Sequence, residues 1–269
     1  MGQATSYFYN DIKPIKRTYG WIKDKISDED IYHNLMLHPA LTSVKSVDLR
    51  DKCPPIYDQG NLGSCTANAI AAAYQFDEMK QGESNAFIPS RLFIYYNERN
   101  IEGTVSTDSG AQIRDGIKSI NTVGVCPETM WPYDPTKFTD QPSSECYADA
   151  KQYHTVQYKK LEQDLNQFKQ CLLEGLPFVF GIVVYESFES DAVTQTGNVP
   201  MPNTDTEKQI GGHAMMCVGY DTDKQVFIVR NSWNNSWGDK GYCYIPFDYL
   251  ANTDLQLASD FWTIETVSQ

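Results

Sequence analysis

The chain has 269 residues, of which 41% are hydrophobic and 21% are charged, and its formal net charge at pH 7 is −13. This composition is ordinary for a protein with a large buried core, folded as one domain or as two tightly packed halves. The acidic balance disfavours nucleic acid and anionic membranes as partners, because both attract clustered Lys and Arg side chains.

The N-terminal residues carry no recognisable secretory or membrane-spanning segment. No apolar run approaches the roughly 18 residues that a membrane-spanning helix needs, and residues 1–17 lack the charged start and apolar middle of a secretory signal. We therefore expect an intracellular protein, or one whose signal has been removed; a vacuolar, lysosomal or virion location also fits. The pattern Met1-Gly2-x-x-x-Ser6 matches the N-myristoylation motif at Gly2, although so short a motif more often matches by chance.

The seven cysteines have two interpretations. One reactive thiol and three disulfides would suit a secreted enzyme, whereas seven free thiols would suit a reducing compartment. Cys171 and Cys217 lie in apolar runs and are typical of buried cysteines, and no pair has the CxxC spacing of a zinc or redox site. Without a signal segment, we expect mostly reduced thiols. The cysteines are Cys53, Cys65, Cys126, Cys146, Cys171, Cys217 and Cys243.

The first part of the chain lacks clear regular structure. Residues 1–45 mix aromatic and charged side chains without a long hydrophobic period. Pro54-Pro55 then excludes a helix and holds the chain extended. A loop punctuated by glycines follows at residues 58–63.

Four helices are predicted from apolar spacing and end signals. The clearest is the Ala-rich segment after Ser64, a residue available as an N-cap, and it ends near Gly82. The other three begin near Ser90, Ser109 and Asp164 and end near residue 99, before Gly124 and at residue 173.

The second half of the chain changes character. Short runs rich in β-branched and aromatic residues, separated by turn residues, are typical of strands. Helices that precede strands indicate an α+β fold with two segregated halves, and a groove between such halves is a common place for a site. The predicted strands cover residues 178–184, 213–220, 226–230, 242–245 and 261–267.

Cys65 is the first candidate for a chemical role. It follows the Gly-rich loop and opens the Ala-rich helix, where unpaired N–H groups and partial positive charge stabilise a thiolate. The thiolate is the nucleophilic form of cysteine. For this residue alone, a buried structural cysteine is an equally good interpretation.

Two further candidates lie downstream. His213 follows Gly211-Gly212, and glycines there remove side chains where a substrate backbone could pass. The side-chain carbonyl of Asn231 can accept the ring N–H of a histidine and fix its tautomer. In the same turn, Trp233 could shield that bond from water, and Trp237 could line the product side of the groove. The alternatives are a core histidine and a polar turn anchored by tryptophans.

Together these segments resemble the papain-like cysteine peptidases over most of residues 47–267. They occur in that family's order of Cys, His and Asn. His213 and Asn231 lie 148 and 166 residues beyond Cys65, against roughly 130–150 in the family, so we expect an enlarged loop at residues 194–208. The matching pieces are Gln59-Gly60-x-x-Gly63-Ser64-Cys65, Gly212-His213-Ala214, Asn231-Ser232-Trp233 and Trp237-Gly238-x-x-Gly241-Tyr242.

The resemblance implies a papain-like α+β fold, with a helical half, a β-barrel-like half and the active-site groove between them. It implies that Cys65 is the nucleophile, His213 its acid/base partner and Asn231 the residue that orients the histidine. The side-chain amide of Gln59 and the backbone N–H of Cys65 would form the oxyanion hole. Acyl transfer of this kind needs neither a metal nor an organic cofactor.

The resemblance also implies a set of substrate contacts. In the family, backbone groups of a glycine stretch pair with an extended peptide, and Ser109-Gly110 occupies that place here. We expect Gly212, Trp233 and Trp237 to line the groove as well. The main specificity pocket is expected to include residues 257–260.

Two residues depart from the family's C-G-[SA]-C-[WY] pattern. Leu62 replaces a cysteine that normally forms a disulfide, and Thr66 replaces the aromatic residue after the nucleophile. Residues 1–45 resemble the short leader of microbial-type members. We therefore expect an inhibitory leader at residues 1–45, with Gly20-Trp21 in or near the groove, before a peptidase domain at residues 46–269.

The predicted activity is that of an endopeptidase made as a zymogen, which acts as a monomer on a peptide or protein substrate. An exopeptidase would need one end of the groove blocked, which residues 194–208 could do. A peptide ligase of the same fold and a non-catalytic peptide-binding relative are the remaining alternatives.

Overall fold

The computed structural model of the chain describes residues 17–33, 43–82 and 86–267. Gly2 and its motif therefore lie outside the described residues. In the described part, no helix is both long and apolar enough to cross a membrane. All seven cysteines are unpaired.

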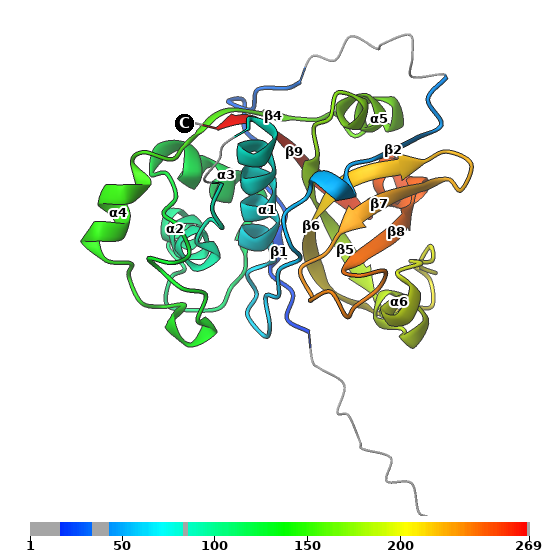
Figure 1. Cartoon of the computed structure of the whole chain (residues 1–269). Helices are drawn as coiled ribbons and strands as arrows, with labels where there is room; N and C mark the ends of the chain where they lie inside the picture. Colours follow the sequence, from blue (N-terminus) through cyan, green and yellow to red (C-terminus); the bar gives the residue numbers. More distant parts are fainter. Residues whose placement is uncertain (1–16, 34–42, 83–85, 268–269) are drawn as a thin grey trace, which may run out of the picture.

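An antiparallel sheet of seven strands forms one half of the molecule, with β2, β5, β6, β7 and β8 on the right in Figure 1 and β4 beside the helices. The strand order is β4-β9-β5-β6-β7-β8, and β2 pairs with β6. The predicted strands are all confirmed, although β6 and β9 are longer than expected, and β2 and β4 were not predicted. The bounds are β2 Ser46–Asp48, β4 Thr155–Lys160, β5 Phe178–Tyr185, β6 Gln209–Asp221, β7 Val226–Arg230, β8 Tyr242–Pro246 and β9 Ala258–Val267.

Helices α1 to α4 form the other half, on the left in Figure 1, and three more helices accompany the sheet. A cluster of phenyl rings holds one of these, α5, to the sheet: Phe168 lies 5.0 Å from Phe178 and 4.4 Å from Phe261, centroid to centroid. The bounds are α1 Cys65–Lys80, α2 Arg91–Glu102, α3 Ile113–Thr122, α4 Ser144–Ala150, α5 Leu165–Leu173, α6 Asp191–Thr196 and α7 Phe247–Ala251.

Helix α1 lies between the two halves and is buried on every side. All its residues from Cys65 to Glu78 are buried, and it contacts β6 and β9 as well as α2 and α3. The small side chains of Ala69, Ala72 and their neighbours explain this position, because they let a helix approach a sheet and other helices closely without a separate polar face. The predicted Ala-rich helix is confirmed.

The start of α3 differs from the prediction. The helix begins at Ile113 rather than near Ser109, and Ala111–Gln112 instead form a strand, β3, which pairs in parallel with Trp21–Ile22, β1. Gly110 has φ +74°, a left-handed conformation that an α-helix does not continue through. The backbone N–H of Ala111 donates to the carbonyl oxygen of Gly20 at 2.7 Å. This pairing partner is distant in sequence, so local helix signals could not reveal it.

Residues 17–33, which we call the N-terminal segment, run along the interface between the halves (blue trace between α1 and β6 in Figure 1). Beyond β1 the segment reaches β4, where the backbone N–H of Lys160 donates to Ile31 O at 2.8 Å. Asp30 forms ion pairs with Arg114 of α3 at 2.6 Å and with Lys160 at 3.0 Å. The segment is thus attached to both halves of the molecule.

Candidate active site

Cys65 is the first residue of α1 and is fully buried. Ser64 precedes the helix, but its side chain makes no capping hydrogen bond; its hydroxyl instead pairs with Tyr133 OH at 2.5 Å. The expected side-chain cap is therefore wrong. The backbone N–H of Thr66, in the first turn of α1, forms a hydrogen bond with the Cys65 thiol.

His213 and Asn231 form a buried pair on β6 and at the end of β7. The ring Nε2–H of His213 donates to Asn231 Oδ1 at 2.8 Å, as the sequence predicted for an orienting asparagine. This bond assigns the proton of a neutral ring to Nε2 and leaves Nδ1 as the basic nitrogen. Nδ1 is buried and has no hydrogen-bond partner within the described ranges. Burial lowers the pKa of His213 to about 4, so the imidazole is neutral near pH 7.

The thiol of Cys65 is also in its neutral form. Burial raises its pKa to about 12, a rise that backbone hydrogen bonds from Ala214, Gly20 and Thr66 only partly oppose. The bond to Ala214 places the sulfur beside the His213 segment of β6. The position of Cys65 at a helix N-terminus predicted a lowered thiol pKa. This expectation is wrong for the enclosed site, because the cost of desolvating the thiolate outweighs its stabilisation by the helix N-terminus.

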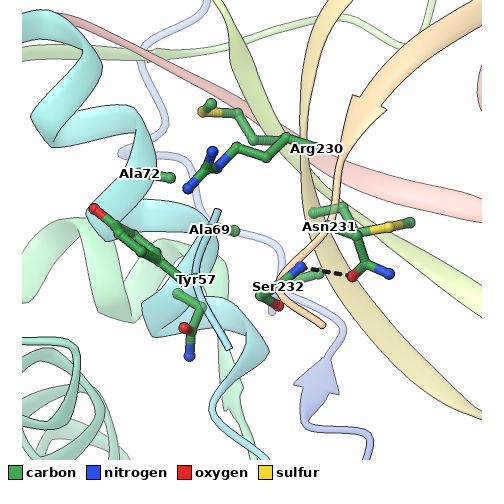
Figure 2. Close-up of a pocket in the computed structure, with 10 residues that line it drawn as sticks. Tyr57, Ala69, Ala72, Arg230, Asn231 and Ser232 are labelled. Carbon is green, nitrogen blue, oxygen red and sulfur yellow. Dashed lines mark hydrogen bonds between the residues drawn. The ribbon is translucent and has the colours of Figure 1, made fainter. Parts of the chain in front are cut away.

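Gln59 connects the loop before α1 to the other half. Its side-chain Nε2 donates to Leu62 O at 2.9 Å and to Thr18 O at 3.3 Å. Its Oε1 accepts from the hydroxyl of Ser232 at 2.7 Å, and the Ser232 backbone N–H donates to Asn231 Oδ1 at 2.8 Å, the dashed line in Figure 2. One serine therefore fixes both the Gln59 amide and the Asn231 amide. Sequence reasoning missed this role, although a hydroxyl directly after Asn231 was a usable signal.

A cavity of about 10 Å³, room for about one water molecule, lies beneath this network. Figure 2 shows Ala69 and Ala72 of α1 on one side and Arg230 and Asn231 on the other. Arg230 is 3% exposed and donates to Pro54 O at 2.6 Å, which ties β7 to the extended segment that leads to Gln59. Asn231 Nδ2 is buried without a hydrogen-bond partner in the described part of the chain.

Aromatic rings enclose the histidine. Trp233 stacks on His213 with centroids 4.7 Å apart and an interplanar angle of 24°. Its position agrees with the expected shielding of the His213–Asn231 bond. Trp237 was expected to line the groove, but it is 3% exposed and packs edge-on against Trp233 at 5.2 Å and parallel to Phe188 at 5.9 Å. It therefore supports the ring of Trp233.

The N-terminal segment passes directly over these residues. Tyr19 packs against His213 and Trp233, with centroids 6.0 and 6.2 Å apart, and its hydroxyl donates to Glu189. Gly20 is so close to the loop before Cys65 that a β-carbon on it would lie 1.7 Å from Gly63 O. The segment thus covers the thiol, the imidazole and the Gln59 amide together.

Glycines line the path of the segment, as expected for a passing backbone. A β-carbon on Gly110 would lie 2.1 Å from Gly20 O, and one on Gly212 would lie 2.6 Å from Trp21 O. The Ser109 hydroxyl instead pairs with Thr104 Oγ1 at 2.9 Å within its own half. The structure therefore brings Gly110 and Gly212 to the segment but not the Ser109 side chain.

No group of three or more His, Cys, Asp and Glu side chains in the described ranges is arranged to hold a metal ion. What the site presents is a thiol at a helix start, opposite a histidine held by an asparagine, across the interface of a helical half and a sheet half. This arrangement is typical of a peptidase that forms a thioester intermediate.

The chain belongs to the papain family of cysteine proteases and is a hydrolase: the model of the papain family cysteine proteases matches residues 43–256. It is 44% identical to xylellain, a cysteine protease of Xylella fastidiosa, whose crystal structure superposes with a TM-score of 0.83 over 93% of this chain and 98% of that one. It is also 44% identical to an uncharacterised peptidase C1-like protein of Acanthamoeba polyphaga mimivirus, over 96% of this chain and 90% of that protein.

A more distant relative is cysteine proteinase 1 of Entamoeba histolytica, 28% identical over 74% of this chain. The match covers 62% of the length of that protein. A cysteine protease of Carica candamarcensis, 17% identical with a TM-score of 0.63, shares the fold. These findings confirm the papain-like α+β fold with its helical and sheet halves.

Proposed function

We propose that Cys65, His213, Asn231 and Gln59 carry out peptide hydrolysis by acyl transfer. Cys65 attacks the peptide carbonyl as a thiolate, and His213 protonates the leaving amine and later activates the hydrolytic water. The Gln59 amide and the Cys65 N–H bind the oxyanion. The observation that supports this assignment is the contact of Gln59 Nε2 with Thr18 O, a peptide carbonyl held where a substrate carbonyl would react.

We further propose that the chain is a zymogen whose N-terminal segment is the inhibitory leader. The segment excludes water from Cys65 and His213, and this desolvation raises the pKa of the thiol and lowers that of the imidazole. Both shifts oppose formation of the thiolate–imidazolium pair that attacks a carbonyl. The leader therefore inhibits by occupying the site and by keeping the pair neutral.

An endopeptidase agrees best with the surroundings of the site. The first part of residues 194–208, the candidate block for an exopeptidase, is bonded to the edge strand β8 and to the turn before it. Gly238 N donates to Thr194 O at 2.7 Å, and Tyr244 pairs with Asn198 as an isolated β-bridge. Because these bonds hold the start of this loop against β8, we propose an endopeptidase.

Replacing Gly20 tests both proposals in the full chain. Gly20→Ala forces a β-carbon into Gly63 O, so we expect the leader to leave the site and hydrolysis of internally quenched peptides to rise at least tenfold without cleavage of the chain. The control is Ile22→Ala, because Ile22 is 40% exposed and its substitution should leave activity at the level of the unchanged chain.

The outcomes separate the two parts of the proposal. Labelling by an epoxysuccinyl inhibitor that disappears in Cys65→Ala supports the nucleophile. Labelling and hydrolysis that are equal in the unchanged and Gly20→Ala chains would contradict the leader. Labelling of Gly20→Ala without any peptide cleavage would favour a ligase or a binding protein.

A further inference from the structure

Trp21 of the leader occupies a recess between β5, β6 and β9. A β-carbon on Gly181 would lie 1.9 Å from Cε2 of the indole, and one on Gly212 would lie 2.9 Å from its Cε3. These glycines belong to neighbouring strands, since Ile182 pairs with His213. The two missing side chains therefore create the space that the indole fills, one residue away from the catalytic histidine.

An acidic group lies at the far end of this recess. The indole N–H of Trp21 donates to Asp260 Oδ2 at 3.1 Å. Asp260 is 5% exposed and belongs to β9. Its carboxylate therefore offers a directed hydrogen-bond acceptor inside the recess.

The backbone at Asp260 is shaped to aim this carboxylate. Asp260 has φ +62°, and β9 carries one extra residue there, because Val179 pairs with Trp262 while Gly181 pairs with Ser259. A bulge of this kind redirects a side chain. A non-glycine residue in the left-handed region is strained, and such strain gathers at functional sites.

Asp260 belongs to residues 257–260, which were expected in the main specificity pocket. We propose that Gly181, Gly212 and Asp260 make this pocket selective for a tryptophan side chain of the substrate, and that Trp21 occupies it as a substrate mimic. This inference rests on the proposed peptidase function and adds its substrate class: peptides with tryptophan at the residue that enters this pocket.

The choice of tryptophan follows from the hydrogen bonds that leader release removes. With the leader bound, Asp260 Oδ2 accepts from the Trp21 indole and from the Asp24 backbone N–H at 2.8 Å. Departure of the leader breaks both bonds. A substrate tryptophan restores the first one, whereas a phenylalanine displaces water from the recess without donating a hydrogen bond to Asp260, which costs a factor of about ten or more.

The full chain with both Gly20→Ala and Trp21→Ala releases the leader and leaves the pocket empty, which allows the preference of the pocket to be measured. A fluorogenic peptide library in which one position at a time is varied should show tryptophan as the preferred residue at a single position, with kcat/KM at least tenfold above that of phenylalanine. Adding Asp260→Ala should reduce this ratio to about 1, and Asp260→Asn, which retains an acceptor oxygen, should keep part of it.

A second variant tests the shape of the pocket. Gly181→Val in the same doubly substituted chain should shift the preference at that position from large aromatic to small residues by at least tenfold. Epoxysuccinyl labelling of each variant counts the folded, reactive sites, so a variant that does not fold is recognised by the loss of labelling.

Three results would overturn the inference. They are an equal preference for tryptophan and phenylalanine, a first preference for arginine or lysine, and a tryptophan preference that survives both Asp260→Ala and Gly181→Val. Each of these results can be observed only if the enzyme cleaves peptides of the library. If no peptide is cleaved by the labelled, doubly substituted chain, it is the proposed peptidase function that fails.

Discussion

Thr66, which replaces the family's aromatic residue after the nucleophile, has a defined partner in the structure. Its hydroxyl donates to Oε1 of Glu98 at 2.7 Å, and Glu98 is fully buried on α2. Burial raises the pKa of Glu98 well above its usual value, which favours the neutral acid. The threonine that departs from the family pattern therefore forms a buried hydrogen bond between α1 and α2.

The first prediction tests this link. Thr66→Val keeps the shape of the side chain but leaves a buried oxygen of Glu98 without its donor, so the free energy of unfolding should fall by about 1–3 kcal/mol. Thr66→Ser retains the hydroxyl and is the matched control. Urea unfolding of the two variants measures the difference, and equal midpoints would show that the bond contributes nothing.

Ser232 is expected to act on catalysis by positioning Gln59. In the Gly20→Ala chain, adding Ser232→Ala leaves the bond to Leu62 O as the remaining hold on the Gln59 amide. We expect kcat to fall on the order of tenfold with little change in KM, because the oxyanion forms only in the transition state. Gln59→Ala in the same chain should cost about 10²–10³ in kcat. A fall in kcat/KM caused only by a higher KM would contradict this role.

At the residue scale, the sequence was enough to propose Cys65, His213 and Asn231, because each stands in a short local motif and the motifs keep one order. The partners of Ser232 and the backbone of Asp260 could not be predicted in this way. A hydroxyl acquires a role only when folding brings Gln59 to it, and the extra residue in β9 shows only in its register with β5.

At the scale of elements, close packing of helices depends on Gly116 of α3. A β-carbon there would lie 2.4 Å from Cδ1 of Ile70 on α1 and 2.5 Å from Oε2 of Glu98 on α2. Three helices therefore meet at a residue without a side chain, directly beside the Thr66–Glu98 link.

We expect Gly116→Ala to lower the free energy of unfolding by about 1–3 kcal/mol, because overpacking outweighs the roughly 1 kcal/mol by which alanine favours a helix over glycine. Lys118→Ala on the exposed face of α3 is the control and should stay within about 0.5 kcal/mol of the unchanged chain. Thermal or urea unfolding gives both values, and a Gly116→Ala chain at least as stable as the control would refute the packing argument.

Most long elements could be predicted from end signals and periodicity, whereas those defined by a distant partner could not. Strand β4 has the polar sequence of an edge strand, and it can be recognised as a strand only from its pairing with β9. Strand β3 exists because β1 lies beside it. Helices α4, α6 and α7 have seven residues or fewer, too short for an apolar period to emerge.

At the scale of the whole molecule, titratable groups should couple binding of the proposed leader to pH in opposite directions. Burial and the neighbouring Asp260 raise the pKa of Asp24 to about 7, so bound leader takes up a proton and its binding weakens as pH rises from about 4 to 7. The pKa of His213 is lowered to about 4, so bound leader releases a proton and its binding weakens as pH falls from about 6.5 to 4. Over the shared range the two effects oppose each other.

Removing Asp24 should weaken the first effect. Burial also raises the pKa of Asp260 beside it, so Asp24→Asn removes one of two carboxyl groups that oppose His213. The rate of epoxysuccinyl labelling of Asp24→Asn, divided at each pH by that of the Gly20→Ala chain, should rise as pH falls from about 6.5 to 4. The unchanged chain should show a shallower slope over the same range. Asp28→Asn, an exposed leader residue, is the control, and the same slope in all three chains would contradict the opposing titrations.

The connection between the N-terminal segment and β2 has a consequence for concentration. The leader and the site belong to one chain, which turns their association into an intramolecular step with an effective concentration in the millimolar range. Weak intrinsic affinity is then enough to keep the site closed. A single cut between His33 and Ser46 would change this to an ordinary bimolecular equilibrium, and at about 1 μM protein the leader would face a local concentration about a thousandfold lower. Dilution alone would then release the leader. The fraction of sites that a severed leader occupies should therefore depend on protein concentration, whereas the fraction occupied in the intact chain should not.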